Sequence, residues 1–109
     1  MLYFLTVPTE APPSITATHI GDTSIAVAWN DPSLTSEVWD IFQGYVVYIG
    51  QAESDQYNVT IINEHRNFIT LLGLEPLVTY NISVAAYTLA GVGKKSDIIA
   101  VTTTFGKDI

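Results

Sequence analysis

The sequence predicts an all-β sandwich of short antiparallel strands, and three observations lead to this prediction. Apolar and polar residues alternate in short runs, as they do on strands with one buried face. Turn-forming pairs such as Gly21-Asp22, Asp31-Pro32 and Glu75-Pro76 separate these runs. No long segment shows the 3.6-residue period of an amphipathic helix. A chain of 109 residues, 48% of them hydrophobic, is sufficient for one such domain and its core.

Seven strands are predicted, beginning near residue 14. In the clearest of them, Ile25, Val27 and Trp29 share one face. The predicted strands are residues 14–18, 24–30, 44–50, 57–62, 68–72, 79–88 and 98–104. We expect loops elsewhere, including the unusually apolar segment 30–43 and the glycine-containing segment 89–96.

Charge and composition exclude several classes of function. Eleven acidic and four basic side chains give a net charge of −7, whereas nucleic-acid binding needs clustered basic residues. The chain has no cysteine, which excludes disulfides, thiol catalysis and zinc sites of the cysteine type. His19 and His65, the only histidines, are not at metal-ligand spacing, and we expect them to be solvated. No apolar run approaches the ~20 residues that span a bilayer. We therefore expect no cofactor, no metal, no catalysis and no membrane insertion.

A set of residues spread along the chain indicates which family of β-sandwich domains the sequence resembles. In chain order they are Pro13, Ile15, Trp29, Pro32, Gly44-Tyr45, Gly73-Leu74, Pro76, Tyr80, Gly91, Gly93, Ser96 and Thr102-Thr103. Their order and spacing resemble the fibronectin type III pattern. The resemblance implies a seven-stranded immunoglobulin-like antiparallel β-sandwich with sheets of three and four strands. An immunoglobulin domain would normally carry two cysteines around its tryptophan, and this chain has none.

The resemblance also implies structural roles for four residues. Trp29 and Tyr45 would form the aromatic centre between the sheets. Tyr80 would form a tyrosine corner, with its hydroxyl bonded to the backbone near Leu74. The family often has threonine two residues before this tyrosine, where this chain has Val78.

The expected domain boundaries follow from the prolines and from the resemblance. Pro8, Pro12 and Pro13 favour an extended linker, because proline fixes φ and lacks a backbone donor. We expect residues 1–11 to be a linker or the tail of a preceding module, 12–104 to be the domain, and 105–109 to be a C-terminal linker. Terminal segments at opposite ends of such a domain suit a tandem array.

Two sequons are candidate modification sites. Asn58-Val59-Thr60 and Asn81-Ile82-Ser83 would be glycosylated in the secretory pathway, with Asn81 on an outward face of its strand. Such triplets also occur by chance, so the sequons alone do not decide the compartment.

Two surfaces are candidate protein-binding sites. Trp39, in the apolar segment 30–43, either packs over the end of the sandwich or forms a binding hot spot. Val46, Tyr48, Ala85 and Tyr87 are expected to project outward as an exposed patch. The alternative is that strand propensity alone selected these residues.

We therefore predict a non-catalytic protein-binding and spacer module in the ectodomain of a cell-surface receptor or adhesion protein. It would be extracellular, contact neighbouring domains of the same chain and be monomeric in isolation. The alternatives are a spacer of an intracellular muscle-type giant protein and a spacer of a secreted bacterial carbohydrate-active enzyme. The sequons and the low charged fraction of 14% favour the first reading over the muscle-type spacer. Segment 89–96 lacks the Arg-Gly-Asp triplet of some family members, so integrin binding is not implied.

Overall fold

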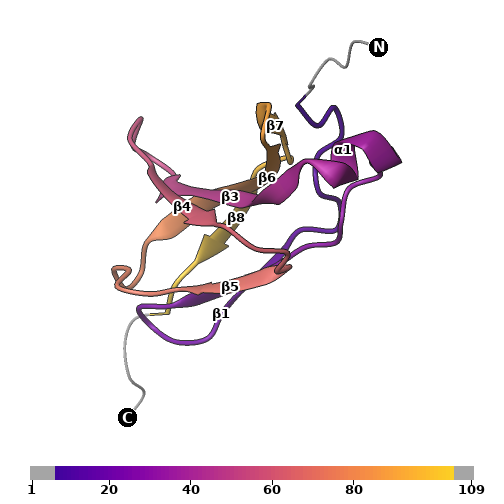
Figure 1. Ribbon diagram of the computed structural model, residues 1–109. Coiled ribbons are helices and arrows are strands. Elements are labelled where there is room, and N and C mark those ends of the chain that lie inside the picture. Colours follow the sequence, from indigo (N-terminus) through magenta and orange to yellow (C-terminus); the bar gives the residue numbers. More distant parts are fainter. Residues whose placement is uncertain (1–6, 105–109) are drawn as a thin grey trace.

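The computed structural model describes residues 7–104 as two antiparallel sheets packed face to face (Figure 1). The smaller sheet has the order β1-β2-β5, formed by Thr16–His19, Ile25–Ala28 and Phe68–Leu71. The larger sheet has the order β4-β3-β6-β7, formed by Asn58–Ile62, Phe42–Gln51, Thr79–Thr88 and Gly91–Lys95. A last strand, β8 (Ile99–Thr102), also pairs with β6. The predicted all-β immunoglobulin-like sandwich is confirmed.

Strands β7 and β8 occupy one edge of the larger sheet, as two parts of one broken strand. β7 pairs with the second half of β6, and β8 pairs with its first half. Ser96, between them, donates its backbone N–H to the Val84 carbonyl at 2.8 Å and accepts the Val84 N–H on Oγ at 2.9 Å. Our prediction of a loop over residues 89–96 was wrong for β7, because pairing with β6 outweighs the low strand propensity of glycine.

The apolar segment 30–43 contains a helix that the sequence did not predict. This helix, α1 (Ser36–Asp40), is capped by Thr35, whose hydroxyl accepts the Val38 N–H at 3.4 Å. A helix of five residues is too short to show a helical period in the sequence. It lies at the end of the sandwich near the start of the described chain (Figure 1).

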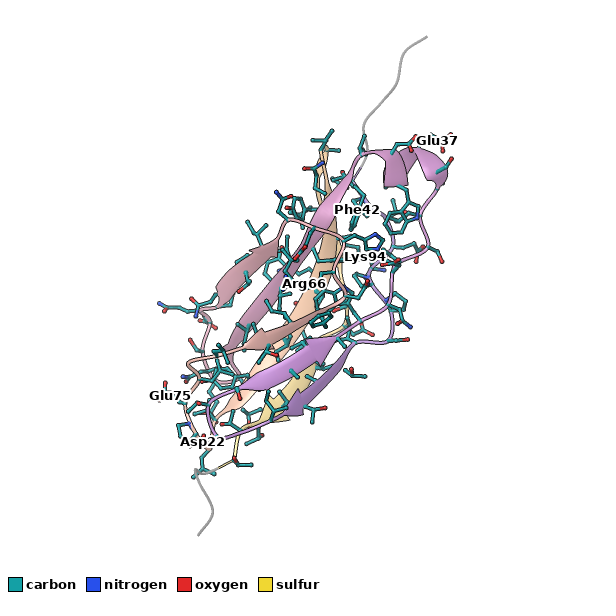
Figure 2. All side chains as sticks on the ribbon, turned by 60° about the horizontal axis from the view of Figure 1, so that its bottom comes forward. Asp22, Glu37, Phe42, Arg66, Glu75 and Lys94 are labelled. Carbon is teal, nitrogen blue, oxygen red and sulfur yellow. The ribbon has the colours of Figure 1, made fainter. Side chains whose placement is uncertain are left out.

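The core lies between the sheets and draws on both of them. It contains Ile25, Val27, Trp29, Tyr45, Val47, Ile49, Ile62, Leu71, Tyr80, Ile82, Val84 and Ala86. Most of these residues occupy alternate positions along their strands, as the pleat requires. The rings of Trp29 and Tyr45 meet edge to face with centroids 5.3 Å apart, and Leu74 packs against the core from its loop. Figure 2 shows the side chains filling the space between the layers.

Tyr80 ties the loop before β6 to the sandwich. Its hydroxyl accepts the backbone N–H of Glu75 at 2.8 Å. The buried hydroxyl of Thr103 donates to the Glu75 carbonyl at 2.6 Å and accepts the Val78 N–H at 3.1 Å. The loop between β5 and β6 is therefore held both by the tyrosine and by the last residues of the domain.

The start of the described chain packs onto the sandwich without forming a strand. Pro8 and Pro12 are fully buried. The Pro8 carbonyl accepts the Lys94 N–H at 3.1 Å. A Cβ at Gly93 would come within 2.6 Å of the Pro8 Cβ, so this approach requires glycine. The predicted linker thus contacts the domain from residue 8 onward, while residues 1–6, 105–109 and the side chain of His19 lie outside the described part.

The two ends of the described chain lie at opposite ends of the larger sheet (Figure 1). Pro8 lies beside β7, near the Thr88 end of β6. At the other end, the Thr104 carbonyl accepts the Leu77 N–H at 3.1 Å, just before β6 begins. The length of β6 therefore separates the entry of the chain from its exit.

Candidate functional site

One end of the sandwich holds a cluster of aromatic and polar side chains, which we call the end cluster. It consists of Asp31, Trp39, Phe42, Tyr45, His65 and Asn67. They come from the segment after β2, from α1, from β3 and from the loop between β4 and β5. Residues far apart in the sequence thus meet at one site.

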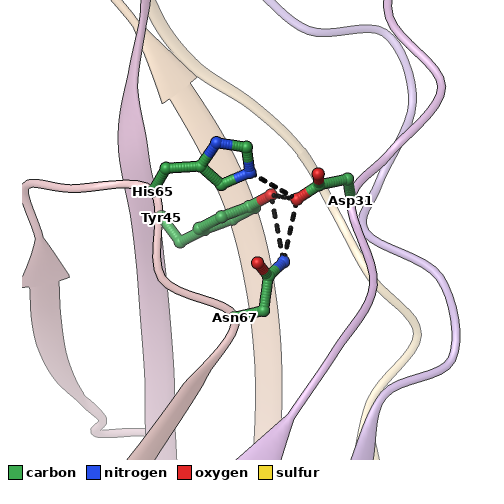
Figure 3. A network of polar contacts seen from close by, with 4 residues as sticks. All are labelled: Asp31, Tyr45, His65 and Asn67. Carbon is green, nitrogen blue, oxygen red and sulfur yellow. Dashed lines mark hydrogen bonds and ion pairs between the residues drawn. The ribbon is translucent and has the colours of Figure 1, made fainter.

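A single carboxylate oxygen holds the polar part of the end cluster together (Figure 3). Asp31 Oδ1 accepts the Tyr45 hydroxyl at 2.6 Å and the Asn67 side-chain amide at 2.8 Å. His65 Nε2 lies 2.8 Å from the same oxygen. Because a carboxylate only accepts hydrogen bonds, this geometry assigns the ring proton of His65 to Nε2. Three segments of the chain are fastened at this point.

The network shifts the titration of its two acidic groups in opposite directions. Partial burial alone would raise the pKa of Asp31, but hydrogen bonds from Tyr45, Asn67 and His65 outweigh it, so the pKa is lowered. Burial, followed by the bond to the charged Asp31, raises the pKa of the Tyr45 hydroxyl. Asp31 therefore stays ionised and Tyr45 stays protonated at neutral pH, which makes this site a structural clamp.

The aromatic part of the end cluster fixes Trp39. Its ring is stacked on His65, with centroids 5.3 Å apart at 23°, and lies 4.8 Å from Phe42. Trp39 is only partly buried. It therefore packs over the end of the sandwich and also presents a fixed aromatic surface. His65 is exposed, as expected for a solvated histidine, but it also contacts Asp31 and Trp39, which the sequence did not predict because both are distant in the chain.

The outer face of the larger sheet differs from the predicted exposed patch. Val46 is 4% exposed and Ala85 is 0% exposed, so neither contributes accessible surface. Val46 lies in an inner strand between Ile61 and Ala85. Ala85 is small and lies beside Lys95 on β7. Both positions are therefore covered by neighbouring side chains of the same sheet.

Two tyrosines of that predicted patch remain partly exposed. Lys95 Nζ lies 4.1 Å from the ring centroid of Tyr48, a cation–π contact, and burial followed by the proximity of Tyr57 raises the pKa of Tyr48. The Tyr87 hydroxyl donates to Asn63 at 2.9 Å. Both rings are held in place by neighbours.

The edge strand β4 carries exposed apolar residues that the sequence did not predict as a surface. Val59 and Ile61 are exposed, and so is Tyr57 just before the strand. The alternation in Asn58–Ile62 was the available signal, because one face of an edge strand need not be covered.

The two sequons lie in different surroundings. Asn58 is exposed at the start of β4, whereas Asn81 is partly exposed in the middle of the larger sheet. Residues 7–104 contain no group of three or more side chains placed to bind a metal ion. The same part of the chain contains no helix that is long and apolar enough to cross a membrane.

The fold and the end cluster define the class, a small β-sandwich module with aromatic surfaces at one end and on one face. Residues 10–102 match the fibronectin type III domain family, and the chain belongs to that family. Domains of this family are typically non-catalytic structural modules.

Known proteins similar to this chain include a cell adhesion molecule and a receptor-type phosphatase. It is 28% identical over 102 residues to the mouse cell adhesion molecule DSCAML1, covering 89% of this chain and 5% of that protein. It is 30% identical over 102 residues to bovine receptor-type tyrosine-protein phosphatase F, covering 90% of this chain and 5% of that protein. The third fibronectin III domain of human KIAA0343 protein has the same fold, with a TM-score of 0.84 and 21% identity, covering 99% of this chain and 92% of that one. The chain thus spans about 5% of the length of these curated relatives.

Proposed function

We propose that this chain is a non-catalytic module of the extracellular part of a receptor or adhesion protein. Residues 12–104 form the module, and residues 1–11 and 105–109 connect it to neighbouring domains in a tandem array. It spaces those domains and binds protein through its end cluster or outer face. The relatives named as an adhesion molecule and a receptor-type phosphatase support this class.

The observation that carries the spacer role is the placement of the chain ends. Pro8 packs beside β7 at one end of the larger sheet, and Thr104 is bonded to Leu77 at the other. A module with this geometry adds its full length to an array. The buried prolines at the entry limit bending against a preceding domain.

Trp39 is the proposed anchor for a protein partner. Its contacts with His65 and Phe42 hold the ring before binding, so little side-chain entropy would be lost on association. Tryptophan is enriched among hot spots for this reason and for its large area. Tyr48 and Tyr87 offer a second, similarly fixed surface, to which Val46 contributes only from beneath.

The test uses the domain secreted from mammalian cells and displayed against a panel of purified ectodomains of cell-surface proteins. We expect at least one ectodomain to bind, with Trp39→Ala weakening it about tenfold or more. Leu77→Ala is the matched control, because Leu77 is exposed at the opposite end. Two results would contradict the proposal. One is a domain that is not secreted in folded form. The other is a domain whose binding is unchanged in Trp39→Ala, Tyr48→Ala and Tyr87→Ala, as it is in the control Leu77→Ala.

A further inference from the structure

The outer face of the larger sheet has a hollow at Asn81. On β6, Asn81 pairs with Gly50 of β3 on one side and with Ala100 of β8 on the other. Because Gly50 has no side chain, the chain at Gln56 and Tyr57 approaches the sheet closely there, while Ala100 on the other side of Asn81 is small. The result is a shallow hollow of about 190 Å³, in which Asn81 forms part of the lining.

Aromatic rings form one wall of this hollow. Tyr57 lies over Gly50, since a Cβ there would come within 3.1 Å of the Tyr57 Cβ. Tyr57 meets Tyr48 edge to face at 5.7 Å, and the Lys95 ammonium lies over both rings. The wall therefore presents fixed apolar ring surface beside polar groups.

The polar lining of the hollow suits a hydroxylated ligand. Besides the lysine, it includes Gln51, Ser54, Asp55 and Gln56. Sugars bind where the C–H face of a ring meets an aromatic side chain and hydroxyl groups meet amides and carboxylates. The lining offers both kinds of contact, with ring surface on Tyr48 and Tyr57 and polar side chains such as Gln56.

The sequon places a covalent attachment point inside the hollow. Ser83, the hydroxyl residue of Asn81-Ile82-Ser83, is 6% exposed, and Ile82 is 1% exposed. An oligosaccharyl transferase must therefore act on this sequon before the sheet closes. Once the sheet has formed, a sugar on Asn81 can only extend into the hollow or away from it.

We infer that Asn81 carries an N-glycan whose first sugar lies in the hollow against Tyr57 and Tyr48. This sugar covers Tyr48, so that Trp39 and Tyr87 remain as the uncovered protein-binding positions. The inference rests on the proposed extracellular function, since it requires passage through the secretory pathway. In the modification, Asn81 Nδ2 bonds to C1 of the sugar and loses one proton. The bond from C1 to a lipid-linked pyrophosphate breaks, and the lipid pyrophosphate leaves.

Asn58 provides an internal control in the same chain. It pairs with Ile49, whose side chain is in the core, so Asn58 lies on the opposite face of the sheet from the hollow. A glycan on Asn58 would leave the tyrosines uncovered. The two sites therefore differ in what the first sugar contacts while sharing the same cellular route.

The experiment compares secreted glycoforms by intact mass and thermal unfolding. The glycan of the Asn58→Gln variant is trimmed by an endoglycosidase to a single sugar on Asn81. The Tm of this protein is compared with that of the double variant Asn58→Gln/Asn81→Gln, which carries no sugar. We expect the single sugar to raise Tm by about 4 °C. Tyr57→Ala should abolish this difference, and Tyr57→Phe should retain it because the ring remains. In the reciprocal comparison, Asn81→Gln carries the single sugar on Asn58. The effect of that sugar on Tm should be the same with and without the Tyr57 ring.

Two results would overturn the inference. One is a folded, secreted domain in which Asn81 is empty; if Asn58 is then occupied, the extracellular function stands and only this inference fails. The other is an occupied Asn81 whose effect on Tm is the same with and without the Tyr57 ring. The first result includes a secreted domain that carries no glycan on Asn58 or Asn81 and still binds an ectodomain through Trp39. In that case the hollow is not a glycan site, and the proposed protein binding stands.

Discussion

Asp31 is the residue on which the end cluster depends, because one of its oxygens receives three side chains. Asp31→Asn keeps the shape but removes the charge, so the domain should lose about 1 kcal/mol of unfolding free energy at pH 7. The pKa of Asp31 is lowered in the folded state, so its stabilising effect is present at higher pH and is lost as the pH falls below about 4. The difference between wild type and variant should therefore shrink in acid.

Urea unfolding at pH 7 and at pH 3 measures this difference. Asp55→Asn serves as the control, since Asp55 is exposed and lies at the other end of β4. The opposing result is an equal difference in unfolding free energy between the wild type and Asp31→Asn at both pH values. That result would show that the carboxylate charge does not stabilise the cluster.

Thr103 shows how a single buried hydroxyl joins two parts of the chain. Its Oγ1 donates to the Glu75 carbonyl and accepts the Val78 N–H. Thr103→Val conserves shape but leaves both backbone groups unpaired, so we expect a loss of about 1–3 kcal/mol in unfolding free energy. Thr102→Val removes only an exposed hydrogen bond to the Thr79 hydroxyl, which water can replace, so it should change the unfolding free energy by less than about 0.5 kcal/mol. Equal losses for the two variants in chemical denaturation would count against this role of the buried hydroxyl.

At the scale of the element, strand pairing depends on Gly44. A Cβ at this position would lie 1.9 Å from the Ile62 carbonyl oxygen on β4. Gly44 precedes Tyr45, where β3 begins to pair with β4, and lies at a register shift between β3 and β6. Because these backbone atoms cannot move aside, Gly44→Ala should lower the unfolding free energy by about 3 kcal/mol. In Gly21→Ala, the added Cβ would have the Ser24 hydroxyl as its nearest neighbour at 3.4 Å, so the loss of unfolding free energy should be much smaller. Thermal unfolding of the two variants checks this, and comparable Tm values would refute it.

Strand β7 depends on glycine for a different reason, which is the approach of the N-terminal segment. At Gly93, an added Cβ would lie 2.5 Å from the Pro8 carbonyl oxygen, the acceptor of the Lys94 N–H. Gly93→Ala should therefore release residues 7–9 and raise amide exchange at Lys94 about tenfold or more. Amides in the centre of β6, such as that of Val84, should exchange at unchanged rates. Unchanged exchange at Lys94 would mean that Pro8 does not protect it.

The elements differ in how far the sequence predicts them. Core strands such as β2 and β6 are predictable because alternation records which face is buried. α1 and β7 are not predictable in this way. α1 is only five residues long, too short to repeat a helical period, and β7 is stabilised by pairing with β6. The end cluster is unpredictable for a related reason. Asp31 and His65 are 34 residues apart in the chain and meet only because two loops share one end of the sandwich.

For the whole molecule, the spacer role requires that the two ends of the chain keep a fixed separation. β6 has ten residues and runs between the entry and the exit, which places them roughly 30 Å apart at about 3.3 Å per residue. The absence of cysteine allows unambiguous labelling of the variant Thr9→Cys/Thr104→Cys with a donor and an acceptor dye.

Single-molecule energy transfer on this labelled domain should give one narrow distance distribution at about 30 Å or somewhat more. Adding Gly93→Ala should broaden it, because the segment at Thr9 is no longer held by Lys94. A control pair on Thr70 and Thr104 should stay narrow in both proteins, since neither position lies near Pro8. A broad distribution in the protein without Gly93→Ala would mean that the entry segment moves freely. The module would then act as a flexible joint between its neighbours, and a rigid spacer role would have to be abandoned.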